Sequence, residues 1–437
     1  MNRELKAKVL SKIKPTKLQE KKLSSDVSKF VEVLEKASNN LNFKCEFFLG
    51  GSYGKGTYLK GKSDIDIFCR FALNYDESKL SEYLEEIIKN SNIDYKKEKG
   101  SRDYYSGEYR SFSFELVPVL KINDLSQAKN TTDMSALHVI YLKSIASKNK
   151  SILDEIRIAK QFIKSKNLYG AESYINGFSG HVIEILISYY GSFQKFIDNA
   201  KDWKEQTVLD ISNHYKNNKS VSNNISKDKQ SSLILVDPIQ KDRNAAKALS
   251  KENYSKFIYV INKIENLKES DFTIKKNNLK SLEQEYDSFS KKNGLYYLIY
   301  KFDFDIKDQS EDIVGSKLLK ISKKIETMFT GNDFRVFESK FHIDMNEQKC
   351  LMVYMFENIT LSKLKKVQGP KVFLKNAIKQ FTKKNRKYEI IGDRIYAYEN
   401  RNLNSIKQLY NIDKNKLSDL FSRDISFIKK VSRKGNF

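Results

Sequence analysis

Apolar residues recur every three or four positions in residues 18–34 and in residues 152–163. This spacing gathers them on one face of a helix, so we predict that both segments are helical. A third apolar stretch, residues 183–190, lies in the same part of the chain, where the helical pattern begins after Leu137. We therefore expect one helix near the N-terminus and, further along, a domain made mainly of helices.

Three shorter stretches in the first third of the chain predict strands instead of helices. They comprise residues 43–49, 65–71 and 111–122, and in the last of them Phe112 and Phe114 alternate with polar residues. Short apolar or alternating runs of this length are typical of strands that bury one face. We expect these three strands to lie in one sheet.

The C-terminal third combines strand and helix patterns. Residues 296–305 alternate apolar side chains with a second face that becomes charged towards its end, which predicts a strand with one exposed face. A helical pattern over residues 312–329 and strand patterns over residues 334–343 and 350–356 follow. Together they predict a small α+β module, like those of many RNA-binding domains.

Residues 216–232 differ from the rest because almost all of them are Asn, Ser, Lys or Asp. Such a composition buries too little apolar surface to fold, so we expect a surface loop or hinge there.

A length of 437 residues is too great for one compact core and suits about two to four domains. The patterns divide the chain into three parts, residues 1–146, 147–265 and 266–437, which we call the head, the neck, and the body and tail. The predicted fold class is therefore multidomain α+β: a head with a mixed β-sheet and helices, a helical neck, and an α+β body and tail.

The charge balance points to polyanionic partners. The chain has 79 basic and 55 acidic residues, a net charge of +24, which favours RNA, DNA or anionic lipid. The alternative is a solvated surface, because Lys and Asn are frequent throughout the sequence. Three widely spaced cysteines support neither a disulfide framework nor a structural zinc site. No uncharged run approaches the ~20 residues of a membrane helix, so we expect a cytoplasmic protein without a membrane partner.

Two carboxylates, Asp64 and Asp66, stand two positions apart in a predicted strand. They must therefore point to one face, while Ile65 and Ile67 point into the core. Paired acids are stable when a divalent cation lies between them, and Mg²⁺ prefers such oxygen ligands together with substrate phosphates. Alone, the pair would be better explained as the exposed face of an edge strand.

A glycine-rich segment precedes the two acids and favours a metal site over an exposed edge strand. It runs from Gly50 to Thr57, where glycines let the backbone approach phosphates, Ser52 offers a hydroxyl and Lys55 a positive charge. Followed at this distance by Asp-x-Asp, it is typical of the nucleotidyltransferase superfamily that resembles DNA polymerase beta. A third metal-binding carboxylate should come from a neighbouring strand, and Glu115 is the acid of the otherwise apolar strand. The alternative for Glu115 is an edge-strand acid that faces water.

Longer motifs narrow the resemblance. The segment from Gly50 to Phe68, including Lys62 and Ser63, looks like the archaeal-type, class I CCA-adding tRNA nucleotidyltransferases. Further motifs occur in the order of that family, namely Glu115-Leu116-Val117-Pro118, Leu137-His138 with Tyr141, Tyr169-Gly170-Ala171-Glu172, Gly177-Phe178-Ser179-Gly180, Tyr190-Gly191-Ser192-Phe193, Asp237-Pro238, Arg243-Asn244-Ala245-Ala246 and Gly369-Pro370. The resemblance covers nearly the whole chain.

This resemblance implies a function and a set of site residues. The enzyme would add C, C and A stepwise to the 3′ end of tRNA from CTP and ATP, without a template, releasing pyrophosphate by two-metal nucleotidyl transfer with Mg²⁺. The partners would be the tRNA acceptor end, CTP and ATP, and a homodimer is left open. The implied metal ligands are Asp64, Asp66 and Glu115. The implied nucleotide contacts are Gly51, Ser52, Lys55, His138, Lys160, Tyr169 and, near the base, Arg243.

The residues themselves support part of this set, because Arg157, Lys160 and Lys164 share one predicted helix face that could meet a triphosphate. For His138, a structural hydrogen bond is an equally good interpretation. The family usually has Asp at Glu115, Arg at Lys55 and Arg-Thr-Pro at residues 134–136, which could alter metal geometry or rate. Two alternatives remain: a second-messenger synthase or poly(A)-type polymerase with the same core, and a tRNA-binding protein without activity.

Overall fold

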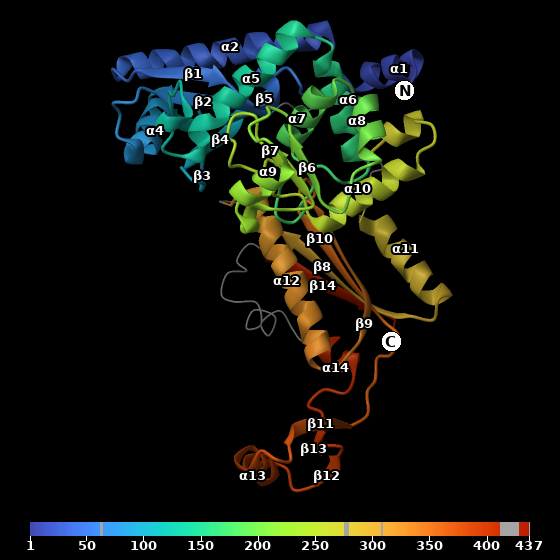
Figure 1. Ribbon diagram of the computed structural model, residues 1–437. Coiled ribbons are helices and arrows are strands. Elements are labelled where there is room, and N and C mark those ends of the chain that lie inside the picture. The colour runs from blue at the N-terminus through green and yellow to red at the C-terminus, as the bar shows by residue number, and fades with distance from the viewer. Residues whose placement is uncertain (62–63, 275–278, 307–308, 411–427, 437) are drawn as a thin grey trace. The chain divides into compact units, whose positions relative to one another are not determined.

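The computed structural model describes residues 1–61, 64–274, 279–306, 309–410 and 428–436, so Lys62 and Ser63 of the predicted motif lie outside the described residues. The chain divides into two units (Figure 1). Unit 1 comprises Met1–Lys275 and Asp308–Asp312, and unit 2 comprises Lys276–Lys307 and Ile313–Phe437. The domain boundaries at residues 146 and 265 stay predictions, because the division into two units does not separate the head from the neck, which both lie in unit 1.

Unit 1 contains a five-stranded mixed sheet in the order β1-β2-β5-β4-β3. The three predicted strands lie side by side in it, which confirms that they share one sheet. β2 runs antiparallel to β1 and parallel to β5, while β4 and β3 continue antiparallel. The strands are β1 Cys45–Leu49, β2 Asp64–Phe71, β3 Lys96–Glu98, β4 Tyr104–Tyr109 and β5 Phe112–Leu120.

Two helices, α2 (Lys17–Asn40) and α4 (Leu80–Asn90), bury one face of this sheet (Figure 1). The predicted apolar face of α2 packs on the strands through Leu23, Val27, Phe30 and Leu34. The helix begins at a capping box in which Thr16 and Gln19 satisfy each other's backbone N–H groups. The opposite face of the sheet stays free of this core and carries the predicted acids.

The remainder of unit 1 is mainly helical, as the sequence predicted. Two parallel strands, β6 (Thr207–Asp210) and β7 (Leu233–Val236), form a separate small sheet. The helices are α1 Arg3–Ile13, α5 Ser135–Lys148, α6 Ile152–Ser165, α7 Gly180–Tyr190, α8 Phe193–Ala200 and α10 Lys251–Lys263. Short 3-10 helices occur at η1 Glu77–Lys79, η2 Leu125–Gln127, η3 Thr131–Met134 and η5 Glu269–Phe272, and α3 Gly51–Gly54 is a single turn.

Residues 216–232 are not the loop that their composition predicted. They form α9 (Asn218–Asn224) and η4 (Lys227–Lys229). Val221 and Ile225 lie four residues apart, and both are buried against Ile234 and Val236 of β7. Two well-placed apolar side chains are enough to hold this otherwise polar helix on the small sheet.

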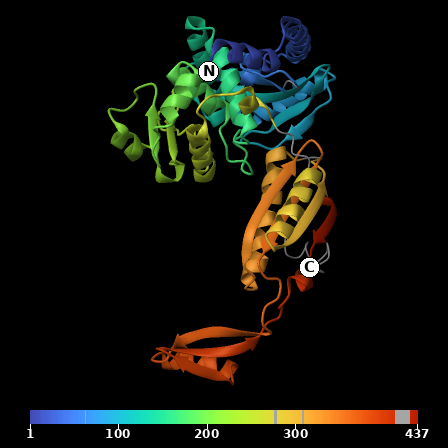
Figure 2. The same ribbon diagram turned by 90° about the vertical axis from the view of Figure 1, so that its right-hand side faces the viewer.

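Unit 2 is built around an antiparallel sheet in the order β14-β8-β10-β9. Its strands are β8 Tyr296–Phe304, β9 Val336–Asp344, β10 Lys349–Phe356 and β14 Ile428–Gly435. Helix α12 (Glu311–Gly331) packs on one face and α11 (Leu279–Lys292) on the other, as Figure 2 shows. The prediction that one face of β8 is exposed is therefore wrong for Tyr297 and Ile299, which α11 buries.

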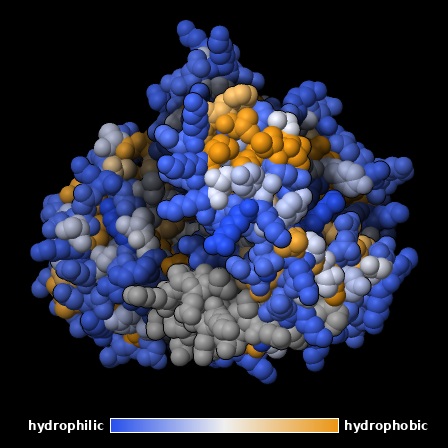
Figure 3. All heavy atoms as spheres, turned by 90° about the horizontal axis from the view of Figure 1, so that it is seen from below, coloured by the Kyte–Doolittle hydropathy of each residue, from blue (hydrophilic) through white to orange (hydrophobic). Residues whose placement is uncertain are grey.

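A second, three-stranded sheet in unit 2 has the order β11-β13-β12. It comprises β11 Leu364–Lys371, β12 Tyr388–Ile391 and β13 Arg394–Asn400, with α13 Lys375–Lys384, and α14 Ile406–Tyr410 follows. Exposed apolar side chains gather here at Phe373, Leu374, Ile390 and Ile391. Figure 3 shows an apolar patch surrounded by hydrophilic residues.

Candidate active site

The three predicted acids lie on one face of neighbouring strands. Asp64 and Asp66 belong to β2 and Glu115 to β5, and the parallel register pairs Asp66 with Glu115. Ile65 and Ile67 point into the core, as predicted. Because β5 lies between β2 and β4, Glu115 is not an edge-strand acid, although it is exposed as that alternative expected. Asp64, at the exposed end of β2, accepts a hydrogen bond from Ser113.

The pKa values of these acids reflect their proximity. Burial raises the pKa of Asp66 to about 6, the negative charge of Asp64 adds to this, and Lys55 opposes it. Desolvation by the surrounding protein also raises the pKa of Glu115 to about 7, with further contributions from the negative charges of Asp66 and Asp64. The site therefore concentrates more negative charge than its own lysines offset. A donor set of three repelling carboxylates fits hard divalent cations such as Mg²⁺.

Two glycines of the loop before these acids, Gly51 and Gly54, lie so close to neighbouring atoms that no side chain would fit there. Gly51 opens α3 with φ +52°, and a Cβ atom there would lie 1.5 Å from Oδ2 of Asp66. At Gly54 a Cβ atom would lie 2.1 Å from the carbonyl oxygen of Leu49 on β1. The backbone of the loop thus contacts both β2 and its neighbour β1 closely, which no side chain at these two positions would permit.

Substitution of Gly51 by Ala should displace the Asp66 carboxylate and strain the backbone. We expect the predicted nucleotidyl transfer to fall by about a hundredfold, since an ~1 Å misplacement has that effect, and stability to fall by ~1–3 kcal/mol. Steady-state transfer assays and thermal unfolding measure both quantities. The matched control is Gly331→Ala, because a Cβ atom at Gly331 meets nothing within 4 Å. Equal activities of the two variants would contradict the role assigned to this contact.

A buried ion cluster ties the loop to the helical part of unit 1. Glu184 on α7 binds Nζ of Lys55 through Oε2 at 2.8 Å and Nζ of Lys160 on α6 through Oε1 at 2.8 Å. The Thr57 hydroxyl donates to the same Oε1 at 2.9 Å and accepts from Lys160. Burial alone would raise the pKa of Glu184, but Lys160 and Lys55 hold it well below its ordinary range. One buried carboxylate thus faces two ammonium groups, which leaves net positive charge beside the site.

Arg157 was predicted to share a triphosphate-facing side of α6 with Lys160 and Lys164, but its contacts lie within the protein. Its Nε donates to the carbonyl of Tyr58 at 3.1 Å, Nη2 donates to that of Gly56 at 2.7 Å, and Nη1 pairs with Asp154. The side chain is buried. Arg157 therefore holds the loop in place from within, because each of its three guanidinium nitrogens already makes a hydrogen bond inside the protein.

A pocket of about 330 Å³ adjoins Asp66 and contains several predicted nucleotide contacts. Its lining residues are Gly51, Lys55, Asp66, Phe68, Thr131, Thr132, Ser135, His138, Val139, His181 and Arg243. Ser52, Lys160 and Tyr169 lie outside this lining. Lys160 is enclosed in the ion cluster, and the ring of Tyr169 lies 4.6 Å from Nζ of Lys164. The roles of all predicted contacts stay predictions.

Two further residues of this pocket region were not predicted as site residues, His181 and Asp237. Asp237 follows β7; both of its oxygens face Nε2 of His138, and Oδ2 also faces Nε2 of His181. Asp237 belongs to the Asp237-Pro238 motif, which was noted only for the family resemblance, and His181 directly follows the Gly177–Gly180 motif. Because His138 and Asp237 are 99 positions apart, no local spacing signals their contact.

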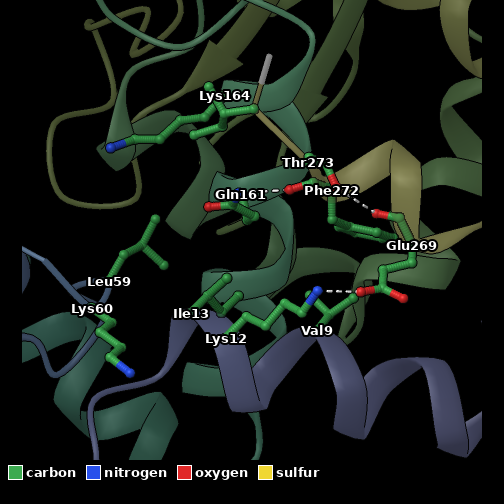
Figure 4. A pocket seen from close by; sticks show the side chains of 11 residues that line it. Val9, Lys12, Ile13, Leu59, Lys60, Gln161, Lys164, Glu269, Phe272 and Thr273 are labelled. Carbon is green, nitrogen blue, oxygen red and sulfur yellow. Dashed lines mark hydrogen bonds and ion pairs between the residues drawn. The ribbon is translucent and has the colours of Figure 1, made fainter. Parts of the chain in front are cut away.

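A second pocket, of about 400 Å³, lies between α1, α6 and η5 (Figure 4). Lys12 pairs there with Glu269, and Gln161 donates to the carbonyl of Phe272 at 2.6 Å. Lys164 lines this pocket too, but the acid in the lining is already neutralised by Lys8 and Lys12. The three repelling carboxylates place the candidate reaction centre at the other pocket.

Curated relatives resemble the chain over most of its length. A CCA-adding enzyme of Nanoarchaeum equitans is 32% identical over 91% of this chain and 94% of its own. The chain belongs to the CCA-adding enzyme family. A CCA-adding enzyme of Methanocaldococcus jannaschii is 31% identical over 93% of this chain and 89% of its own. The recognition made from the sequence motifs is thereby confirmed.

Family models match three successive parts of this member of the CCA-adding enzyme family. Residues 3–135 match a second messenger oligonucleotide or dinucleotide synthetase domain, and residues 154–273 match the second domain of tRNA nucleotidyltransferase. Residues 297–431 match the C-terminal domain of CCA-adding enzymes. A solved structure of Cid1, described with RNA terminal uridylyl transferase activity, has a TM-score of 0.50 at 11% identity and covers 63% of this chain and 100% of its own. That likeness concerns the fold. No described helix combines the length and apolarity needed to cross a membrane.

Proposed function

We propose that this protein adds C, C and A stepwise to the 3′ end of tRNA, using CTP and ATP without a nucleic-acid template and releasing pyrophosphate. The observation that carries the proposal is the family-wide match together with Asp64, Asp66 and Glu115 on adjacent strands. The relatives are named for this activity, and the carboxylate geometry suits nucleotidyl transfer.

Asp64, Asp66 and Glu115 would hold Mg²⁺, which would supply positive charge for the α-phosphate and for the attacking hydroxyl of the tRNA end. Around it, the chain's own residues bind and orient. Lys55 brings a positive charge to the pocket wall while Glu184 fixes its position. Gly51 lets the backbone approach Asp66 closely, and Arg243 lies at the same pocket, where a base could be read.

The tRNA would meet unit 2 as well. Residues 364–400, which span the three-stranded sheet, contain ten Lys or Arg and three Asp or Glu. Such a surface suits phosphate contacts, so we expect tRNA affinity to fall steeply with salt. The cytoplasmic location and the homodimer stay predictions.

The deciding experiment sequences the products made on tRNAs that end before the first C, after one C and after two. We expect addition of the missing nucleotides in each case, with C before A, and no addition without divalent cation. A single C added to every end would contradict the proposal, as would addition of long homopolymers. A tRNA with a complete CCA end is the matched control and should accept nothing.

The match of residues 3–135 to second-messenger synthetases favours one rival, a synthase that joins nucleotides without RNA. Incubation with α-labelled CTP or ATP, with and without tRNA, separates the two functions. Labelled small products formed without RNA would support the synthase. Tight tRNA binding with no incorporation at any Mg²⁺ concentration would instead identify an inactive tRNA-binding protein.

A further inference from the structure

Asp237 is a buried carboxylate with an unusual number of donors. Its Oδ1 accepts from the backbone N–H groups of Ile239 at 2.9 Å and Gln240 at 3.2 Å. Both oxygens lie 3.0 Å from Nε2 of His138, and Oδ2 also lies 3.1 Å from Nε2 of His181. Asp237 itself is 0% exposed. These contacts join α5, α7 and the segment after β7 at one point.

The same oxygen, Oδ2, also binds Nη1 of Arg243 at 3.3 Å. His181 and Arg243 must therefore lie beside each other, because both reach one atom. Both also line the pocket that contains Asp66. Asp237 lies behind this wall and holds the two side chains that face the pocket.

A carboxylate only accepts hydrogen bonds, so the imidazole nitrogen that faces Asp237 must carry the proton. For His181 this is Nε2. Burial lowers the pKa of His181 to about 4, although Asp237 opposes this, so the ring is neutral near pH 7. Its second nitrogen, Nδ1, then has no proton and can only accept. His181, which lines the pocket, thus brings a ring with one acceptor nitrogen next to the guanidinium donors of Arg243.

This pair matches a feature that cytosine and adenine share. Both bases present an amino group beside an unprotonated ring nitrogen on the Watson-Crick edge, whereas uracil and guanine present a carbonyl beside an N–H group. An acceptor and a donor side by side complement the first arrangement and oppose the second. Sites that pair buried polar groups in this way discriminate strongly, because the wrong base leaves them unpaired.

We propose that Asp237 is a positioning residue for base selection: it fixes the tautomer of His181 and the place of Arg243, so that bases with a cytosine- or adenine-like edge are accepted. The inference rests on the proposed function and deepens it. It assigns the specificity to a residue that does not itself touch the nucleotide.

The alternative interpretation of these residues is a metal site, since the possible ligand atoms of His138, His181 and Asp237 lie within 4.8 Å of one another. Two observations oppose it. Oδ1 of Asp237 already accepts two backbone N–H groups, and the cation of Arg243 lies 3.3 Å from Oδ2. A bound metal would need the lone pairs that these donors occupy.

The test is Asp237→Asn in the full-length protein. The amide has the same shape but can present an N–H group to His181, which would favour the opposite tautomer, as happens when Asp becomes Asn behind a catalytic histidine. We expect the ratio of kcat/KM for CTP over UTP, on tRNA that lacks its 3′ end, to fall at least about tenfold. The control is His214→Gln, because His214 contacts the carbonyl of the adjacent Pro238 and does not line the pocket.

A second variant, His181→Phe, keeps the pair of Asp237 and Arg243 but removes the acceptor. It should relax the choice of CTP over UTP and leave the folded state intact, because His181 is partly exposed. Long-range proton–nitrogen NMR spectra of the histidines provide an independent readout. They should show Nε2 protonated and Nδ1 unprotonated for His181 in the wild type, with the reverse in Asp237→Asn.

Unchanged base discrimination in both variants would overturn the proposal, as would a protonated Nδ1 in the wild-type ring. So would a metal ion bound stoichiometrically to the purified protein and lost in His181→Phe. Equilibrium binding of CTP and UTP, measured without tRNA, keeps this test separate from the proposed function. If the wild type transferred nothing to tRNA, the function would fail, while the binding preference and the tautomer would still decide the role of Asp237.

Discussion

Asp66→Asn is expected to reduce nucleotide transfer by at least on the order of a thousandfold, because the amide cannot replace a carboxylate that faces both Asp64 and Glu115. The affinity for tRNA should stay within a few-fold of the wild type, since the proposed phosphate contacts lie elsewhere on the protein. Stability without divalent cations should not decrease, because the raised pKa of Asp66 shows that its charge opposes folding near neutral pH. Transfer assays, filter binding and thermal unfolding measure the three quantities.

The matched control for this prediction is Asp76→Asn. Asp76 is an exposed acid that caps the short helix η1 through Ser78, and Asn caps helices equally well. This control should keep full activity. Substantial transfer by Asp66→Asn would show that the metals are held elsewhere, whereas loss of tRNA binding together with transfer would indicate a folding defect.

Glu184→Gln should have the largest effect on stability. The substitution leaves Lys55 and Lys160 without the carboxylate that both now contact at 2.8 Å. Breaking a buried ion cluster by removing one member destabilises a protein by about 3–5 kcal/mol. Trp203, the single tryptophan of the chain, lies in unit 1 and stacks on Tyr254, so its fluorescence during urea unfolding reports on that unit.

The same cluster predicts a pH dependence. Because the folded pKa of Glu184 lies below its ordinary value of 4.5, its contribution to stability is complete above that value and is lost as the pH falls through the folded pKa. Glu184→Gln should remove that part of the acid sensitivity. The control, Glu205→Gln, breaks an exposed pair with Lys251 and should change stability by less than about 1 kcal/mol. Similar losses of stability in both variants would mean that the buried ion cluster stabilises the protein no more than an exposed ion pair does.

The alternation of acids and isoleucines was enough to predict which face of β2 carries Asp64 and Asp66, because a strand has only two faces. The same reasoning selected Glu115, since a lone acid in an apolar strand stands out. Local patterns could not predict β3 and β4, which are short, polar and interrupted by Gly107.

The errors had a common physical origin, namely burial by segments distant in the sequence. Tyr297 and Ile299 lie beneath α11, and Val221 and Ile225 lie against β7, and neither cover is visible in the local pattern. His181 and Asp237 meet for the same reason, because tertiary structure brings together elements that are 56 residues apart. The nucleotide contact that the family resemblance implies for Lys160 stays a prediction, and its enclosure by Glu184 depends on the packing of α6 against α7.

The ion cluster around Glu184 crosses the border between two family matches. Lys55 and Thr57 belong to the segment that matches synthetase domains, whereas Lys160 and Glu184 belong to the segment that matches the second domain of tRNA nucleotidyltransferases. In a chimaera that joins the head of another protein to this neck, the loop of that head would therefore place its own charges beside the buried carboxylate of Glu184. Unless Glu184 is exchanged together with Lys55 and Lys160, a buried charged group at this junction would lose its partner of opposite charge.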